Sequence, residues 1–421
     1  MEKQNVKTTG SKSPAGVGRF RAAGVFLGFV TAGMALTLAA RAQEVAAPAS
    51  RPAATQPSRF APPGTPVKET KPIPAYWKTT LADIDQALAE VRKGKVDVLG
   101  RSAGGRKLYV VRYGQAPDID SQAFYNSACG GGEPAAYARK PAGTPPVVLL
   151  LGPVHGQEIE GIAGVMNLIH LAETGADLRG KTYPRLLENF QKCRVLIVPS
   201  GNPDGRARTP LESFIGEDMQ TQTYYGMGTF TNGRLRQWPQ VKREQPMAGD
   251  VGFLGAYFND AGINPMHDDW FGRMQGESDA ILDLARREAV DYGLSLHTHG
   301  SGPQVLQTDY MDEKCQEKAV VISERVSARF PQMNERTNPI RRRNPAPPSS
   351  QPSRRRRYTP DAFNLCSALH HVCGGTILLY ENSCGVKGYH QTTPDTLLDL
   401  QMVVFEELLA YAVENPVVWE R

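Results

Sequence analysis

Short apolar runs alternate with longer periodic segments along most of this chain, and the two patterns predict different elements. Five runs rich in apolar residues, bounded by polar or turn-forming residues, predict strands at 108–112, 147–151, 194–198, 293–297 and 376–380. Apolar residues that recur every three or four positions predict helices at 162–171, 277–289 and 396–411. Strands that alternate with helices favour an α/β domain built in layers around a largely parallel sheet.

An earlier helix carries its own start signal. Thr80 can accept a hydrogen bond from the first helical turn, and Asp83 three residues later can return one, which is the pattern of a capping box. The apolar residues that follow lie on one stripe and end before Gly94: Leu81, Ile84, Leu88 and Val91. We therefore expect a helix that begins directly after Thr80.

A histidine and a glutamate occupy a predicted junction between strand and helix. His155 and Glu158 lie three residues apart, between the apolar run 147–151 and the periodic segment 162–171. This position predicts His155 in the turn and Glu158 in the first turn of the helix.

A third candidate ligand lies far downstream, in the strand predicted at 293–297. Side chains of a strand alternate between its two faces, so Ser295, His297 and His299 share one face. On this pattern alone either histidine could reach a metal. Two imidazoles and one carboxylate form a three-ligand zinc site that keeps an open position for water.

These residues belong to a set of four motifs that resembles the zinc carboxypeptidase family, typified by pancreatic carboxypeptidase A. The likeness runs from about residue 76 to about residue 409, and the motifs follow the family's order. They are a Gly-x-Ser-x-x-Gly-Arg-like segment at 100–106, the His-x-x-Glu pair with its distant histidine, an Asn-Pro-Asp-Gly turn at 202–205, and a strand at 376–380 followed by Glu381. The resemblance implies a three-layer α/β fold with a mixed, mostly parallel sheet flanked by helices.

The resemblance also implies roles for individual residues. One zinc ion is expected on His155, Glu158 and His297, with Glu381 as the general base. Arg243 lies in the region of the family's oxyanion-stabilising arginine, and Tyr358, 23 residues before Glu381, resembles its mobile substrate-closing tyrosine. Three further residues are expected to contact substrate: Asn264, His267 and His299.

Two positions depart from the family pattern. Peptide-trimming members hold the substrate's terminal carboxylate with an Asn-Arg pair, but here Pro265 follows Asn264. Gln157 replaces the arginine that the family places between its first two metal ligands. Proline donates no hydrogen bond, so the two-pronged grip on a carboxylate is lost. Removal of ordinary carboxyl-terminal residues is therefore in doubt.

The amino-terminal part of the chain predicts export. Basic residues precede an apolar stretch at 22–40, which ends in Ala40-Arg41-Ala42, a small-x-small cleavage pattern. We expect a signal peptide at 1–42, a Pro- and Ala-rich linker at 43–74 and a catalytic domain at 75–421. Cleavage would leave no stable membrane span, and the product would be periplasmic or secreted.

Charge is unevenly distributed once the signal is removed. Residues 1–42 hold six basic residues and one acidic residue, so their loss lowers the net charge from +5 to zero. Seven arginines bracket a Pro- and Ser-rich stretch within 337–357, which predicts a basic loop inserted in the domain. Such a loop is most simply a solvated surface loop, and it could also hold an anionic cell-wall polymer or acidic lipid. Nucleic acid is not an expected partner of an exported protein.

The six cysteines permit disulfides in an exported chain, but their spacing does not choose a pairing. No pair has zinc-finger spacing, so thiolate metal binding is not predicted. His370 and His371 are interpreted as structural.

Together these features predict an exported zinc-dependent hydrolase of peptide or amide bonds. Two alternatives remain open from the sequence. One is a zinc deacylase of N-acyl amino acids similar to aspartoacylase, which shares the His-x-x-Glu motif and the distant histidine. The other is a catalytically silent module that binds cell-wall peptides, against which the presence of Glu381 beside three ligands argues.

Overall fold

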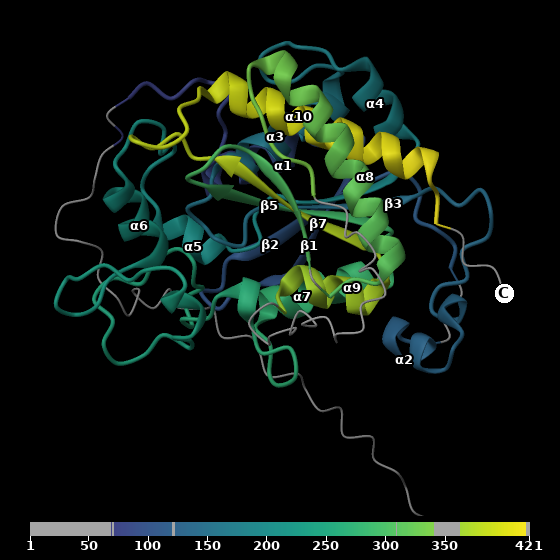
Figure 1. Cartoon of the computed structure of the whole chain (residues 1–421), viewed down its shortest axis with the longest axis horizontal. Helices are drawn as coiled ribbons and strands as arrows, with labels where there is room; N and C mark the ends of the chain where they lie inside the picture. The colour runs from purple at the N-terminus through teal and green to yellow at the C-terminus, as the bar shows by residue number, and fades with distance from the viewer. Residues whose placement is uncertain (1–68, 70, 120–122, 309, 341–362, 418–421) are drawn as a thin grey trace, which may run out of the picture. The chain divides into compact units, whose positions relative to one another are not determined.

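The structure is a computed structural model that describes residues 69, 71–119, 123–308, 310–340 and 363–417 (Figure 1). The expected signal peptide, nearly all of the expected linker, Tyr358 and the arginine-rich part of the inserted loop lie outside the described residues.

A mixed sheet of seven strands forms the centre of the described part of the chain, in the order β1-β2-β4-β3-β5-β7-β6. Strands β3, β4, β5 and β7 run parallel, whereas β1, β2 and β6 join antiparallel. The strands are β1 (Lys95–Arg101), β2 (Lys107–Tyr113), β3 (Val147–Leu151), β4 (Arg194–Val198), β5 (Tyr292–His299), β6 (Gln304–Gln307) and β7 (Thr376–Ser383). All five predicted strands are present, and β1 and β6 are added at the two edges.

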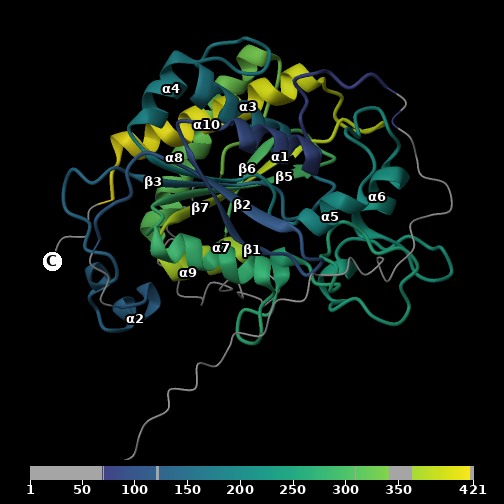
Figure 2. The same cartoon turned by 180° about the vertical axis from the view of Figure 1, so that it is seen from behind.

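Helices cover both faces of this sheet, which makes the three layers (Figures 1 and 2). One face packs on α1 (Leu81–Glu90), α3 (Glu160–Thr174), α4 (Pro184–Gln191), α8 (Glu313–Arg329) and α10 (Pro394–Glu414). The other packs on α2 (Tyr125–Gly130), α7 (Gly276–Arg287) and α9 (Leu365–Cys373). Every residue of β3 and β4 is buried, because both faces of these strands meet helices.

The start of α1 is the one that the sequence predicts. The Thr80 hydroxyl accepts a hydrogen bond from the Asp83 backbone N–H at 3.0 Å, and the Asp83 carboxylate accepts one from the Thr80 N–H at 3.0 Å. Each bond satisfies an N–H that the helix itself leaves unpaired, and such a cap stabilises a protein by about 1 kcal/mol.

The turn between β1 and β2 is tied to the start of α5 (Pro203–Arg208), about a hundred residues away. Asp204 is fully buried and accepts hydrogen bonds from the Ser102 hydroxyl at 2.5 Å and from the Arg106 guanidinium at 2.8 Å. Two of the motifs seen in the sequence, at 100–106 and 202–205, therefore contact each other directly in the fold. This contact anchors the turn at 202–205, which lies beside the candidate metal ligands.

A buried ion pair lies at the other end of the parallel strands. Lys140 Nζ donates to both carboxylate oxygens of Asp291, at 2.8 Å each, and also to the Ala289 carbonyl. Asp291 accepts a further hydrogen bond from the Val147 N–H at 2.8 Å, so it links the starts of β3 and β5. Burial raises the pKa of Asp291, and Lys140 opposes that shift.

All six cysteines are among the described residues, and each is a free thiol. Within the same residues, no helix combines the length and the apolar character needed to cross a bilayer.

Candidate metal centre and active site

His155 and Glu158 lie in the connection between β3 and α3, where the chain makes a tight turn. The Glu158 N–H donates to the His155 carbonyl at 3.0 Å, and α3 begins only at Glu160. The prediction that Glu158 occupies the first helical turn is therefore wrong, because this turn closes before the helix starts. Gly156 is required here: a Cβ at its position would lie 2.1 Å from the Gly205 carbonyl carbon.

Three side chains meet at this turn. The Glu158 carboxylate lies between two imidazoles, with His155 Nδ1 2.9 Å from Oε1 and His297 Nδ1 2.9 Å from Oε2. One potential ligand atom from each of the three residues lies within 4.8 Å of the others, and all three side chains are buried. The spacing in the sequence and the alternation along β5 thus converge on one cluster.

The surroundings of this cluster fit a zinc ion. Ser295 Oγ lies 3.0 Å from His297 Nε2, so the hydroxyl can accept the proton of a ring whose other nitrogen binds metal. Tyr257 stacks on His155 at 3.8 Å between ring centroids, which fixes the plane of that imidazole. The second nitrogen of His155 is buried without a hydrogen-bond partner among the described residues. Two oriented imidazoles and a carboxylate are the donor set of a catalytic zinc site.

The charges within the cluster also suit metal binding, which requires deprotonated ligands. Burial alone would raise the pKa of Glu158, but the two histidines lower that pKa to about 2. Burial lowers the pKa of His155, although Glu158 opposes this effect. Burial also works to lower the pKa of His297, but the charge and hydrogen bond of Glu158 and the charge of Glu381 together raise it above its usual value.

Glu381 lies on β7 directly beside the cluster. β5 and β7 pair in parallel with His297 opposite Glu381, so the two side chains leave the sheet on the same face. The Glu381 carboxylate accepts no hydrogen bond from any described residue. Burial raises its pKa to about 7, with His297 lowering and Glu158 raising it. A carboxylate with this pKa can exchange protons near neutral pH.

Asn264 and His267 lie close to His155, at the two ends of a short 3-10 helix, η3 (Pro265–His267). Asn264 caps this helix by accepting a hydrogen bond from the Met266 N–H at 2.9 Å, while its amide nitrogen is buried without a partner among the described residues. Pro265 occupies the first helical position, where its missing N–H costs nothing. Burial, followed by the charge of Lys242, lowers the pKa of His267 to about 3.

The structure does not bring the remaining predicted residues to the cluster. Arg243 is exposed and lines a separate hollow with Phe230 and Arg236. His299 is exposed at the end of β5, where its Nδ1 accepts a hydrogen bond from the Ser301 N–H at 3.0 Å. Tyr358 lies outside the described residues. The roles expected for these three residues stay predictions.

Two residues that the sequence analysis did not single out do lie at the site. Tyr257, besides stacking on His155, has a pKa raised well above its usual value by burial and then by the charge of Glu158. Lys242, which lies 4.5 Å above the Trp238 ring, is close enough to His267 to lower its pKa. No motif marks either residue: between α6 (Met219–Met227) and α7, Lys242 ends a single-turn 3-10 helix, η2 (Gln240–Lys242), and Tyr257 lies in irregular chain.

Comparison with models of protein families identifies the family to which this chain belongs. The family model described as zinc carboxypeptidase matches residues 85–338, more than half of the chain. The chain therefore belongs to the zinc carboxypeptidase family, whose members use one zinc ion. The match includes the three candidate ligands but ends before Glu381. A comparison with curated proteins found no match.

Solved structures of the same kind resemble this chain at low identity. A metallo-carboxypeptidase from Burkholderia cenocepacia is 14% identical over 79% of this chain and 69% of its own, with a TM-score of 0.50. Carboxypeptidase A from Helicoverpa armigera is 13% identical over 81% and 75%, with a TM-score of 0.42. At such identities the Burkholderia match shows a shared fold and nothing finer.

Proposed function

We propose that this chain is an exported hydrolase of peptide or amide bonds that uses zinc and has Glu381 as its general base. The observation that supports it most is the register of β5 and β7, which sets a half-buried carboxylate, without hydrogen-bond partners among the described residues, beside the ligand His297. A carboxylate in this position has no structural task that the fold reveals. A silent binding module would have no use for it.

The chemistry of each side chain suggests its role in the proposed reaction. His155, Glu158 and His297 would hold the zinc, which when bound lowers the pKa of a water towards ~7 and polarises a carbonyl. Glu381 accepts a proton from the attacking water and later delivers it to the nitrogen of the leaving amine. Tyr257 and Ser295 keep the two imidazoles in position. Asn264 and His267 are proposed to contact the substrate, together with His299 at the rim.

The substrate class is a peptide or another amide, with weak dependence on a free terminal carboxylate. Pro265 offers no side-chain donor, and Gln157 is neutral where the family pattern has arginine. Lys242 is a positive charge near the site, but a single ammonium lacks the planar two-pronged grip of a guanidinium. Because Pro265 and Gln157 replace the family's arginines, N-acyl amino acids also remain candidate substrates, as for a deacylase.

Export is proposed from residues 1–42, with a periplasmic or secreted product. The basic segment 337–357 is proposed to bind an anionic cell-wall polymer by charge attraction, which salt would weaken. Determining the amino terminus of the protein recovered from its native host tests the first proposal. An amino terminus other than Gln43 would reject the predicted cleavage site.

The replacement Glu381→Gln tests the chemistry most directly. It removes the proton acceptor and keeps the shape, so we expect hydrolysis to fall by ~10²–10⁴ while zinc content stays unchanged. The substrates compared would be peptides, N-acyl amino acids and cell-wall peptides.

Glu335→Gln is a control, because Glu335 is a glutamate with restricted exposure that lies 2.7 Å from His390 Nε2 as an ion pair rather than facing the cluster. Wild-type rates in Glu381→Gln would move the base elsewhere. A zinc-loaded protein that turns over none of the substrates would favour the silent module, and a preference for N-acyl amino acids would favour the deacylase.

A further inference from the structure

We propose that Asp312, Cys315 and His370 form a second metal site, for a divalent transition ion of the zinc type. One ligand atom from each of these side chains lies within 4.8 Å of the other two. The carboxylate and thiol come from the start of α8 and the imidazole from the last turn of α9. Because the two helices are far apart in the sequence, no short motif predicts this group.

Asp312 has one carboxylate oxygen committed and one available. Its Oδ1 accepts a hydrogen bond from the Cys315 N–H at 2.9 Å and so caps α8. Its Oδ2 points to the imidazole, 3.6 Å from His370 Nε2. This separation is close to that of two ligands on one tetrahedral zinc ion, since each would lie about 2.0–2.2 Å from the metal.

His370 is held in the orientation that a metal ligand needs. Its Nδ1 lies 2.9 Å from the Gly375 carbonyl, which can only accept, so Nδ1 carries the proton and Nε2 has the lone pair. Metal-binding histidines are commonly fixed by this kind of bond to a carbonyl. Nε2 accepts a long hydrogen bond of 3.3 Å from the Asp312 N–H, which a metal ion would replace.

The thiol completes the donor set. Cys315 is 5% exposed, and its Sγ lies 3.6 Å from the Gly374 carbonyl, a weak hydrogen bond that a metal can replace. Metal binding releases the thiol proton and forms a metal–thiolate bond. Thiolate with imidazole favours zinc over magnesium or calcium, which prefer oxygen ligands alone.

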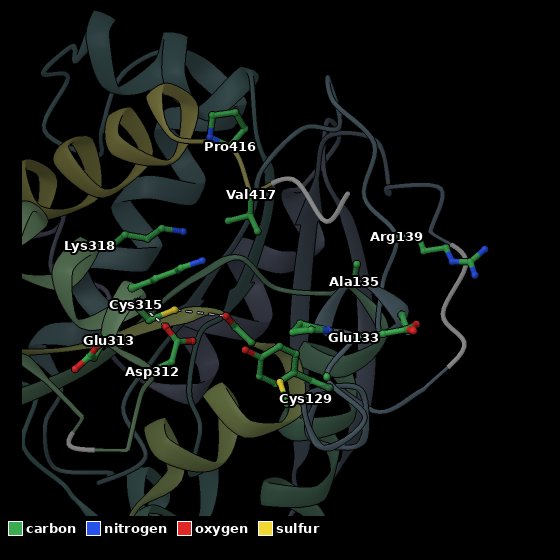
Figure 3. Close-up of a pocket in the computed structure, with 16 residues that line it drawn as sticks. Cys129, Glu133, Ala135, Arg139, Asp312, Glu313, Cys315, Lys318, Pro416 and Val417 are labelled. Carbon is green, nitrogen blue, oxygen red and sulfur yellow. Dashed lines mark hydrogen bonds between the residues drawn. The ribbon is translucent and has the colours of Figure 1, made fainter. Parts of the chain in front are cut away.

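The site opens on a cavity of about 1270 Å³, whose wall includes Asp312 and Cys315 (Figure 3). Cys129 supplies a second sulfur to this wall, and Lys318 a positive charge. A metal held by three protein ligands keeps a fourth position, and the cavity beside Asp312 and Cys315 would leave room for its occupant. A water or a small anionic or thiol-bearing ligand could occupy it.

This site is separate from the catalytic centre. Gly374 precedes β7 by two residues, whereas Glu381 lies near the other end of the strand. The five residue steps of strand from Thr376 to Glu381 alone span about 17 Å at ~3.3 Å each. None of the residues that line the cavity belongs to the catalytic cluster.

Cobalt(II) distinguishes the two sites by their ligands. The catalytic cluster has no thiolate, so a thiolate-to-cobalt charge-transfer band in the near ultraviolet can arise only from a cysteine-containing site. We expect the metal-free full chain to take up two equivalents of cobalt and to show this band. Cys315→Ser should lose the band and one equivalent, while His155→Ala should keep the band and lose the other equivalent.

Two further variants guard against misfolding as an explanation. Asp312→Asn keeps the helix cap, since asparagine caps as well as aspartate, but removes the charged ligand, and we expect metal affinity to fall at least about tenfold. Cys193→Ser alters another buried thiol, one that belongs to no metal-binding group among the described residues, and should leave the band intact.

Uptake of a single equivalent without a thiolate band would overturn the proposal and leave the three residues as a capping network. A band that survives Cys315→Ser would also overturn it. Loss of activity with both equivalents and the band intact would count against the proposed hydrolase function and not against this site.

Discussion

Two buried charged clusters lie at opposite ends of the same parallel strands, and they differ in how completely they are satisfied. At the start of β5, Lys140 and Asp291 use each other and two backbone groups, as described above. At the far end, Glu158 is shared between two histidines, and His155 Nε2 has no partner among the described residues. We call the Lys140–Asp291 cluster closed, because its polar atoms all have partners, and the cluster of His155, Glu158 and His297 open, because within the described part of the chain it has a nitrogen without one.

The difference separates a structural task from a chemical one. A buried ion pair with all its hydrogen bonds made has no capacity left for a ligand, and breaking it leaves an uncompensated charge. A buried cluster with unused donor atoms costs free energy unless something binds there, and a divalent ion supplies the missing contacts. We therefore expect changes at the two ends to have different consequences, one in stability and the other in metal and activity.

The largest effect is expected at the open cluster. Replacement of His155, Glu158 or His297 by alanine should remove the catalytic zinc and abolish hydrolysis, because two ligands hold the ion too weakly. Metal analysis after dialysis measures the loss, and His299→Ala is the control from the same face of β5. If His299→Ala lost the zinc while His297→Ala retained it, the assignment along β5 would be wrong.

At the closed cluster we expect a loss of stability instead. Asp291→Asn leaves the Lys140 ammonium buried without its counter-charge, which typically costs about 3–5 kcal/mol. Chemical denaturation measures the change, while zinc content and activity per folded molecule should stay near wild type. Asp283→Asn removes an exposed carboxylate that pairs with Arg286 and Arg287, and should cost less than about 1 kcal/mol.

Glu277 is another buried carboxylate, no cation among the described residues pairs with it, and its titration should make stability depend on pH. Burial raises the pKa of Glu277 to about 7. The hydrogen bond from its own backbone opposes this rise, and the charge of Asp204 adds to it. The folded protein therefore binds a proton that the unfolded chain has released, and stability from this group falls as pH rises from about 4.5 to about 7. Glu277→Gln has no ionisable carboxyl at this position and therefore does not lose stability in this way as pH rises.

We expect Glu277→Gln to gain stability relative to wild type as pH rises, by up to about 3 kcal/mol at pH 8. Denaturation at several pH values between 5 and 8 measures the trend. Asp279→Asn, exposed in the same first turn of α7, controls for losing an acidic residue there. A difference that stays constant across this range would contradict the shifted pKa.

The smallest effect is expected from the substrate's carboxyl terminus. Because Pro265 and Gln157 remove the family's arginines, amidating a good substrate should lower kcat/KM by less than about tenfold, equal to ~1.4 kcal/mol. Paired kinetics on the free acid and the amide measure it. A loss of several hundredfold would mean that another cation, such as Lys242, binds the carboxylate.

Much of the fold and the metal cluster could be predicted from local sequence. β3 and β4 are fully buried, so their composition is uniform and their bounds were predicted to the residue. The cap of α1 depends on residues three apart, and alternation along β5 placed His297 on its face. Such features follow from backbone geometry that each segment carries in its own side chains.

Other features exist only in the tertiary structure, because contacts between distant segments create them. β6 has four residues of mixed exposure and is a strand only because β7 pairs with it. Tyr257 stacks on His155 from a segment without regular structure, and the turn that holds Glu158 out of α3 depends on packing against Gly205. The sequence by itself determined which residues could bind metal. Whether their atoms meet was decided by long-range packing, which a local pattern does not contain.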